Sequence, residues 1–247
     1  VPYEGPEFAH ALQFQPRAEQ QEICSEISSV TGDFGIQAPC GFGKTYLAAF
    51  VGAQQRGRVL IIVPNNNKAN EWRREMARFY GLDPQQIGLI QGSTRKWTEY
   101  PVVIGMAKTI AMQTFTREEQ MAFGLTVNDE GHLNTARVNS QANAKFGGRR
   151  LILTATPGKG ARRDILDLHY GKNWLRPHAD TMQCRFEMLP VPVWSKFESM
   201  DWDRLSTLIG RDFKYVDIAA KVTQQLLEQG RRVLVVNHQI DPLATIY

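Results

Sequence analysis

The chain has 247 residues, of which 43% are hydrophobic and 22% are charged, and its formal net charge is +4. This composition can form the core of one large domain, or of one domain and part of another. No segment has the apolar length of a membrane-spanning helix and no charged-then-apolar leader is present, which argues against membrane and secreted classes. We therefore expect a cytoplasmic or nuclear protein that is not secreted and has no membrane partner.

Charge and cysteine content limit the possible partners and cofactors only weakly. A mild positive charge permits a polyanionic partner without requiring one, because local clusters determine where polyanions bind. Cys24, Cys40 and Cys184 are widely spaced and form no CxxC pair, which argues against a disulfide framework and a zinc site. Cys40 precedes a predicted helix, where a thiolate is favoured, so it is either a regulatory thiol or, more simply, a small filler.

The chain begins at Val1 and ends at Tyr247 directly after an apolar run, so we expect a fragment with missing elements. Residues 1–16 carry several prolines and glycines without a sustained period, and they predict an N-terminal arm. Apolar residues then recur at helical spacing over residues 17–30, after Pro16. Within this helix, the Gln20 amide could pair with an adenine edge, or it could be a solvated helix residue.

Residues 38–45, Ala-Pro-Cys-Gly-Phe-Gly-Lys-Thr, form the most informative stretch. They follow an apolar run and precede a helical pattern, so a strand, a glycine-bearing loop and a helix N-terminus are predicted in succession. In such a loop, backbone N–H groups and the Lys44 ammonium face a phosphate, and the Thr45 hydroxyl can bind Mg²⁺. Ala38 stands where the usual pattern has glycine, whereas Gly41 and Gly43 are in register. The alternative is a turn that is glycine-rich by chance.

Strand-like and helix-like segments alternate through the middle of the chain. Residues 66–80 have an apolar stripe that predicts a helix with a buried seam. Runs of buried-strand character occupy residues 58–63, 88–90, 101–105, 124–128 and 149–155. Continuous apolar runs are typical of strands covered on both faces, so the sequence predicts an α/β fold with a mostly parallel β-sheet flanked by helices.

Two carboxylates follow the strand predicted at residues 124–128. A phosphate loop needs a carboxylate that helps to hold Mg²⁺, and Asp129 at the strand end can fill that role. Glu130 can then orient or deprotonate the water that attacks the γ-phosphate. His132 could sense the γ-phosphate or form a link to Thr154 and Thr156, which end the strand predicted at residues 149–155. The alternative is an ordinary solvated pair of acidic residues.

The composition changes beyond about residue 180. Residues 181–200 contain Pro190 and Pro192 and several aromatic residues without a clear period. A helix is predicted over residues 216–229 and a strand over residues 232–237. We therefore expect three parts: the arm at 1–16, an ATP-binding domain at 17–180, and a linker with the incomplete start of a second α/β domain at 181–247.

These segments resemble three motifs of superfamily 2 helicases and translocases. The loop at residues 38–45 resembles motif I, a Walker A or P-loop sequence. Residues 129–132, Asp-Glu-Gly-His, resemble the DEAH-type motif II with Gly in place of Ala, and residues 153–157, Leu-Thr-Ala-Thr-Pro, resemble motif III. The last motif and the segment Gln15 to Gln20 are similar to the branch that contains type III restriction motor subunits, repair translocases and phage helicases.

The resemblance implies a RecA-like domain that binds ATP and Mg²⁺ and moves on nucleic acid, with DNA as the expected partner. It implies catalytic roles for Lys44, Asp129, Glu130 and His132, and coupling roles for Thr154 and Thr156. It implies that Thr45 and Asp129 bind the metal. The implied nucleotide-binding residues are Gln20, Gly41, Phe42, Gly43, Lys44 and Thr45.

Nucleic-acid contacts are implied less specifically. Residues 62–65 resemble motif Ia, with Asn65 where Thr is common, and residues 105–109 stand where motif Ib is expected, with Lys108 and Thr109 as candidates. Each of these residues could instead be an ordinary surface residue. Nothing in the chain matches the arginines of motif VI, so the resemblance implies a second RecA-like domain of the full-length chain as a partner. We expect weak ATP hydrolysis and no unwinding by these residues alone.

Two other kinds of protein could contain a phosphate loop of this type. The same residues could serve a nucleotide-gated DNA-binding or remodelling protein, or a switch, without strand separation. A small-molecule kinase is disfavoured because such an enzyme needs neither the Asp-Glu-Gly-His nor the Leu-Thr-Ala-Thr-Pro strand end. The sequence does not distinguish DNA from RNA, unwinding from translocation, one polarity from the other, or one oligomeric state from another.

Overall fold

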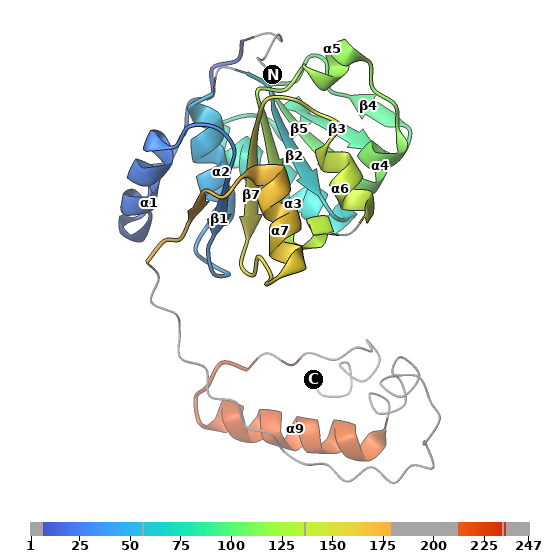
Figure 1. Ribbon diagram of the computed structural model, residues 1–247. Coiled ribbons are helices and arrows are strands. Elements are labelled where there is room, and N and C mark those ends of the chain that lie inside the picture. Colours follow the sequence, from blue (N-terminus) through green and yellow to red (C-terminus); the bar gives the residue numbers. More distant parts are fainter. Residues whose placement is uncertain (1–6, 56, 136, 179–211, 234, 236–247) are drawn as a thin grey trace. The chain divides into compact units, whose positions relative to one another are not determined.

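The computed structural model describes residues 7–55, 57–135, 137–178, 212–233 and 235. The chain divides into two compact units, Val1–Met182 and Gln183–Tyr247. All the strands of the described residues belong to the first unit (Figure 1). In the described part of the second unit, the regular element is the helix α9 (Phe213–Glu228), which has a pronounced apolar side.

The first unit is built on one eight-stranded sheet with the order β4-β3-β5-β2-β6-β7-β1-β8. Its strands are β1 (Phe34–Gln37), β2 (Val59–Val63), β3 (Ile87–Gln91), β4 (Thr94–Lys96), β5 (Val102–Met106), β6 (Leu125–Asn128), β7 (Arg149–Thr154) and β8 (Trp174–Leu175). All pairings among the described strands are parallel except the one between β3 and β4. The predicted α/β fold with a mostly parallel sheet is confirmed.

The strand order determines which chain segments meet at the carboxyl edge of the sheet. After β1 the chain passes to β2 and outward to β3 and β5, and it then returns to place β6 and β7 between β2 and β1. The carboxyl ends of β1, β7 and β6 are therefore neighbours, although they are distant in sequence. Ligands of open parallel sheets bind outside the carboxyl ends of the strands where the order reverses.

Helices cover both faces of the sheet. The helical elements of the first unit are α1 (Ala18–Ser29), α2 (Lys44–Ala53), α3 (Asn66–Tyr80), η1 (Pro84–Gln86), α4 (Ala107–Met112), α5 (Arg117–Gln120), η2 (Gly131–Thr135), α6 (Arg137–Asn143) and α7 (Ala161–Tyr170). Buried residues of α1, α2 and α3 share one apolar cluster, and those of α4 and α6 belong to another. Strand β2 contributes alternate residues to the two clusters, which explains why all five of its residues are buried.

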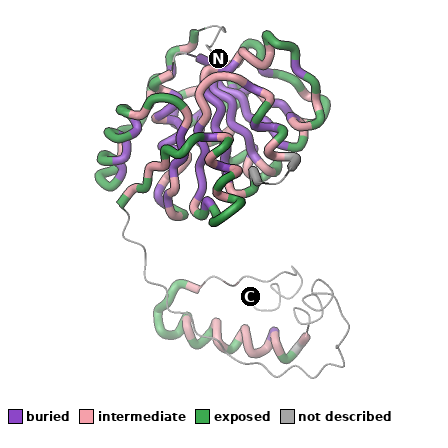
Figure 2. The backbone as a smooth tube through the Cα atoms, viewed as in Figure 1, coloured by how far each residue is buried: buried purple, intermediate pink, exposed green. Residues whose placement is uncertain are grey.

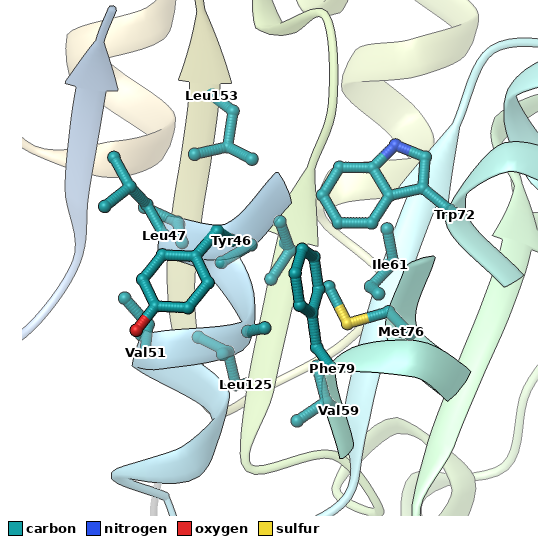
Figure 3. Close-up of a cluster of buried hydrophobic side chains, with 14 of the residues drawn as sticks. Tyr46, Leu47, Val51, Val59, Ile61, Trp72, Met76, Phe79, Leu125 and Leu153 are labelled. Carbon is teal, nitrogen blue, oxygen red and sulfur yellow. The ribbon is translucent and has the colours of Figure 1, made fainter. Parts of the chain in front are cut away.

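The core on the α1, α2 and α3 face places the phosphate loop and helix α3 on a rigid base. Tyr46 of α2 packs edge-on against Phe79 of α3 with ring centroids 5.6 Å apart, in the same cluster as Leu47 and Met76 (Figure 3). The central strands are buried along their length, whereas exposed residues lie on the outer sides of the helices (Figure 2). Burial of one such side chain stabilises the fold by about 1.5–3 kcal/mol, so the many buried side chains on this face contribute strongly to stability.

The described part of the predicted arm, residues 7–16, has no helix or strand but packs against the first unit. His10 is buried, and its Nε2 lies 3.1 Å from the Gly57 carbonyl oxygen. Burial lowers the pKa of His10, and this hydrogen bond partly opposes the shift. Further along, the Phe14 carbonyl accepts a hydrogen bond from the Tyr46 hydroxyl at 3.2 Å. The arm is thus attached along α2 and the end of α3.

Most elements lie where the sequence predicts them, with some differences at the edges. The helix predicted over 66–80 is confirmed as α3, and the one predicted over 216–229 corresponds to α9. The edge strands β4 and β8 are too short to show a clear pattern and were not predicted. The predicted strand at 232–237 lies partly outside the described residues, and its described residues 232, 233 and 235 form no strand. The segment 181–200 lies outside the described residues.

In the described ranges, no helix combines the length and the apolar character needed to cross a bilayer.

Candidate functional site

The loop after β1 requires glycine at two positions because of its backbone conformation. Gly41 and Gly43 have φ values of 82° and 91°, in the left-handed region that favours glycine. Ala38 has no positive φ, so alanine replaces the usual glycine there without strain. The Ala38 N–H donates to the Thr154 carbonyl oxygen at 3.1 Å, which fixes the start of the loop against the end of β7.

Lys44 begins helix α2 and folds back over the loop. Its Nζ donates to the carbonyl oxygens of Ala38 and Pro39 at 3.0 and 3.2 Å. Gly43 is the N-cap, so the free N–H groups of the first helical turn and the Lys44 ammonium lie at the same end of α2. This arrangement of fixed N–H donors and a mobile cation suits a phosphate group.

Two residues of the α1 region hold the loop from outside. Gln20 is only 2% exposed, and its amide nitrogen donates to the Phe42 carbonyl at 2.7 Å, while its oxygen accepts from the Arg17 backbone N–H at 3.1 Å. The interpretation of Gln20 as a solvated helix residue is therefore wrong. Arg17 also donates to the Phe42 carbonyl, at 2.5 Å, and sequence reasoning gave it no role. The signal in the sequence that could have indicated this role is the position of Arg17 at the start of the helix that precedes the loop.

Asp129 follows β6 and is almost completely buried, with 8% of its surface exposed. One carboxylate oxygen accepts from the Trp72 indole N–H at 2.7 Å, and the other accepts from the Glu130 N–H at 2.9 Å. Burial raises the pKa of Asp129, whereas the hydrogen bond from Trp72 and the nearby Lys68 ammonium act in the opposite direction. Asp129 is thus not a residue of an ordinary solvated pair. Trp72 was predicted only as part of a buried helical seam, and its indole N–H, which needs a partner when buried, was the missed signal.

Glu130 has a backbone conformation that is uncommon for a residue with a side chain. Its φ of 51° is the only positive value for a non-glycine residue in the described parts of the chain. Such conformations cost about 1–3 kcal/mol and persist only where the surroundings impose them. The Glu130 side chain is 32% exposed, and its Oε2 lies 3.5 Å from His132 Nδ1. The strained turn therefore holds this carboxylate at the surface, next to the buried Asp129.

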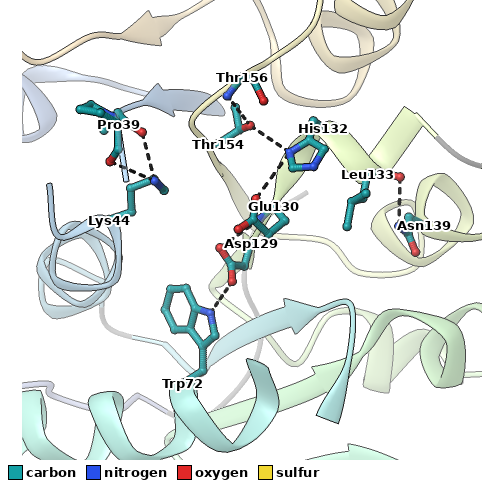
Figure 4. Close-up of polar contacts among 11 residues, drawn as sticks. Pro39, Lys44, Trp72, Asp129, Glu130, His132, Leu133, Asn139, Thr154 and Thr156 are labelled. Carbon is teal, nitrogen blue, oxygen red and sulfur yellow. Dashed lines mark hydrogen bonds and ion pairs between the residues drawn. The ribbon is translucent and has the colours of Figure 1, made fainter. Parts of the chain in front are cut away.

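His132 connects the turn after β6 to the end of β7. Its Nδ1 lies 3.4 Å from Thr154 Oγ1, at the long end of hydrogen-bond range, and Thr154 Oγ1 accepts from the Thr156 N–H at 3.1 Å (Figure 4). Of the two roles considered for His132, this contact corresponds to the link with the threonines. Figure 4 shows these side chains together with Lys44 and Asp129, which come from three neighbouring strand ends.

The glycine in the Asp-Glu-Gly-His sequence is explained by a close approach. A Cβ added to Gly131 would lie 2.1 Å from Cγ1 and 2.2 Å from Cδ1 of Ile152, a completely buried residue of β7. This chain therefore has Gly in place of the Ala of the Asp-Glu-Ala-His form because the Ile152 side chain leaves no room for a methyl group.

The residues proposed for nucleic-acid contact lie along a different part of the same edge. Lys108 and Thr109 line a groove of about 480 Å³ together with Asn66 and the exposed Met112. The Thr109 hydroxyl accepts from the Gly92 N–H at 3.0 Å. Asn65 caps helix α3, because its side-chain oxygen accepts from the Lys68 N–H at 3.0 Å. Its amide nitrogen has no hydrogen-bond partner in the described ranges.

Comparisons with known proteins give a family and a fold. The family described as type III restriction enzyme, res subunit, matches residues 13–159. Among curated proteins, the chain is 27% identical over 226 residues to "DNA 3'-5' helicase XPB" of Kineococcus radiotolerans, covering 84% of this chain and 40% of that protein. It is 28% identical over 170 residues to the protein of the same name from Mycobacterium tuberculosis, covering 66% and 31%. The chain thus spans less than half the length of these relatives.

The fold is shared with solved helicase structures. The structure titled "Crystal structure of the UvsW helicase from Bacteriophage T4" superposes with a TM-score of 0.56 at 21% identity, covering 70% of this chain and 64% of that one. At this identity the likeness concerns the fold. The parallel sheet and the order of the strand ends described above are therefore an architecture that occurs in helicase cores.

Proposed function

Because the chain belongs to the family described as type III restriction enzyme, res subunit, we propose that it is the ATP-hydrolysing motor domain of a superfamily 2 helicase or translocase that moves on DNA. Its first unit has the RecA-like fold of such motors. The observation that carries the proposal is the convergence of three strand ends: the loop after β1, the carboxylates after β6 and the threonines after β7.

ATP binding is assigned to the phosphate loop and the start of α2. The loop N–H groups, the helix N-terminus and Lys44 supply positive charge for the phosphates. Lys44 would exchange its two carbonyl partners for phosphate oxygens, which bind an ammonium more strongly. Gly41, Phe42 and Gly43 form the wall of this cradle, and Gln20 supports it from behind or contacts the adenine.

A Mg²⁺ ion fits the donor set beside the loop. Thr45 offers a hydroxyl that has no hydrogen-bond partner in the described ranges, and each Asp129 oxygen accepts one N–H and keeps a second lone pair. Mg²⁺ prefers oxygen ligands and usually keeps several waters, so two protein ligands suffice. When bound, the ion would neutralise charge on the outer phosphates.

Glu130 and His132 are assigned to hydrolysis and its coupling. The half-exposed Glu130 carboxylate can accept a proton from an attacking water, a task that requires hydrogen-bond reach. His132 can pass a change at Glu130 to Thr154 and Thr156 through the contacts described above. Thr154 contacts both His132 and, through its carbonyl, Ala38 at the start of the phosphate loop, so we propose that the two threonines couple hydrolysis to movement.

Two relatives named as DNA helicases support DNA as the partner. Asn65, Lys108 and Thr109 supply an amide, a cation and a hydroxyl, which are the groups that bind phosphates and sugars. We propose that a second RecA-like domain, whose start we expect within residues 181–247, would supply arginines of the motif VI kind. Loss of such an arginine lowers phosphoryl-transfer rates by about 10³–10⁵, so we expect slow hydrolysis by the 247-residue chain.

The deciding experiment compares the chain with Glu130→Gln and, as a matched control, with Glu118→Gln on the exposed surface of α5. ATP binding and ATPase rates are measured with and without single-stranded DNA, duplex DNA and RNA. We expect Glu130→Gln to bind ATP normally and lose hydrolysis, and Glu118→Gln to resemble the unchanged chain. Failure of Glu130→Gln to bind ATP would contradict the assigned role. If neither DNA nor RNA changes the ATPase rate of the full-length protein, a nucleotide-gated switch is favoured.

A further inference from the structure

A second groove lies on the outer side of helix α3, away from the phosphate loop. It has a volume of about 570 Å³ and is lined by Asn67, Asn70, Arg73, Arg74 and Pro84. Every lining side chain except Pro84 is an amide or a guanidinium, and none is a carboxylate. The groove is therefore basic.

The positive charge of this groove is not neutralised within the described residues. The two carboxylates of α3 already have basic partners, with Glu71 3.0 Å from Lys68 and Glu75 3.5 Å from Arg78. Asp83, next to Pro84, keeps its negative charge while it caps the η1 turn by accepting from the Gln85 N–H, but it forms no ion pair within the described residues. Arg73 and Arg74 form no ion pair in the part of the chain that the structure describes. Two guanidinium charges are thus available on one surface.

The geometry of the two arginines suits a phosphodiester. The Arg73 Nε donates to the Pro84 carbonyl at 2.7 Å, which orients the guanidinium and leaves its two terminal nitrogens available. Arg74 is exposed and shares a helical stripe with Asn67 and Asn70, at spacings of three and four residues. A planar guanidinium can bind two phosphate oxygens at once, and amides can bind the sugar.

The groove is distinct from the ATP site. Pro84 lies in the turn that leads into β3, and β3 is five strands away from β1 in the sheet order. At about 4.8 Å per strand, the Pro84 end of the groove is about 24 Å across the sheet from β1. The other lining residues lie on the exposed side of α3, whereas Trp72 contacts Asp129 from the buried side of the same helix. By contrast, Arg73 is eight residues along α3 from Asn65, or about 12 Å, which corresponds to about three or four phosphates of one DNA strand.

We propose that Arg73 and Arg74 form a further phosphodiester-binding site, which holds the nucleic acid beyond the Asn65 and Lys108 region. This inference rests on the proposed function, since it takes the ligand to be the nucleic acid on which the motor acts. Helix α3 would then contact nucleic acid along its exposed side and the Asp129 carboxylate through Trp72 on its buried side. The first unit would then bind nucleic acid at a site that does not depend on the phosphate loop.

The test is the salt dependence of DNA binding by the 247-residue chain and by Arg73→Gln/Arg74→Gln. A matched control, Arg117→Gln/Lys172→Gln, removes the same charge from exposed residues outside the groove. Fluorescence anisotropy with short labelled duplex and single-stranded DNA gives the affinity at several salt concentrations. For two duplex phosphates we expect the slope of log K against log salt to decrease in magnitude by about 1.8, and affinity at low salt to fall more than about tenfold.

The possible outcomes separate this inference from the proposed function. If the unchanged chain binds no nucleic acid with salt-dependent affinity, the proposed function fails as well. If it binds and the groove variant keeps the slope of the control, only the assignment of Arg73 and Arg74 is overturned. Loss of heparin binding without loss of DNA binding would point to another polyanion and would also overturn it. ATP binding should be unchanged in the variant, and its loss would contradict an independent site. Because Arg73→Gln also removes the hydrogen bond to the Pro84 carbonyl, Arg74→Gln alone, with an expected slope change of about 0.9, separates phosphate binding from a loss of thermal stability.

Discussion

The two turns that form the candidate ATP site differ in what determines their backbone. The loop at residues 38–45 contains the glycines that its positive φ values require, and its carbonyls are held by Lys44 of the same loop and by Gln20. In the turn at residues 129–131, the positive φ belongs to Glu130, and the glycine beside it is needed for close packing. The conformation of the loop at 38–45 is thus determined mainly by its own residues. The conformation of the turn at 129–131 is determined mainly by the residues packed against it.

This difference explains why the two turns depend on distant parts of the chain to different degrees. The turn after β6 is held by Trp72 of α3 on one side and Ile152 of β7 on the other. Each neighbour is nearly or completely buried, so neither can adjust easily. Changes in these neighbours should therefore damage the turn, whereas changes in the loop should act on ATP binding with little effect on the fold.

The largest effect should come from Trp72→Phe, which tests the α3 side of the turn. The substitution removes the indole N–H from the buried Asp129 carboxylate and leaves a small cavity, so we expect the free energy of unfolding to fall by about 3 kcal/mol. The measurement is urea unfolding followed by circular dichroism.

Trp97→Phe is the control for this prediction. Trp97 is also buried, at 5% exposure, but its indole has no hydrogen-bond partner in the described ranges. It should lose packing energy and part of its contact with the Arg58 guanidinium, which lies 5.3 Å from its ring centroid, but no hydrogen bond. Equal losses for the two variants would show that the hydrogen bond to Asp129 adds nothing, and the contrast between the two turns would weaken.

A smaller effect is expected from Gly131→Ala, which tests the β7 side. Because the added methyl group would overlap Ile152, the fold should lose about 2 kcal/mol. The same change in an Ile152→Ala background should cost much less, because the overlapping atoms are gone. Unfolding of the four proteins in this double-mutant cycle gives the coupling energy directly. Additive losses would mean that the turn does not owe its glycine to Ile152.

The sequence predicted the loop and the strand ends well, because their signals are local. Glycine and lysine spacing, buried strand runs and the acidic pair each occupy a few consecutive residues, and the order of the elements is that of an α/β fold. The contacts that position the site could not be predicted in the same way. Trp72 and Asp129 are 57 residues apart, and Ile152 lies on a strand whose place beside β6 depends on the strand order.

Arg58 illustrates the same limit outside the site. In the sequence it begins an apolar run that predicts a strand from residue 58, but β2 starts at Val59. Its guanidinium is almost fully buried and donates to the carbonyls of Thr98, Tyr100 and Ala122. A charged residue in a buried position needs partners from several loops, and no local pattern reveals which loops will meet.

The smallest effect we predict tests the loop itself, through Gly43→Ala with Gly41→Ala as the control. Both glycines have positive φ, so alanine should strain the backbone similarly at either position. They differ in surroundings, because a Cβ at Gly43 would lie 2.5 Å from Gln20 Nε2, whereas a Cβ at Gly41 would meet nothing within 4 Å.

We expect Gly43→Ala to weaken ATP binding about tenfold more than Gly41→Ala does, which corresponds to about 1.4 kcal/mol. Calorimetric titration with ATP measures the difference, and the melting temperatures of the two variants should fall by similar amounts because the backbone strain is similar. If the two variants lose equal affinity, the support from Gln20 contributes nothing to binding, and the loop is wholly determined by its own residues. If Gly43→Ala alone destabilises the fold, the loop depends on its neighbours as much as the turn after β6 does.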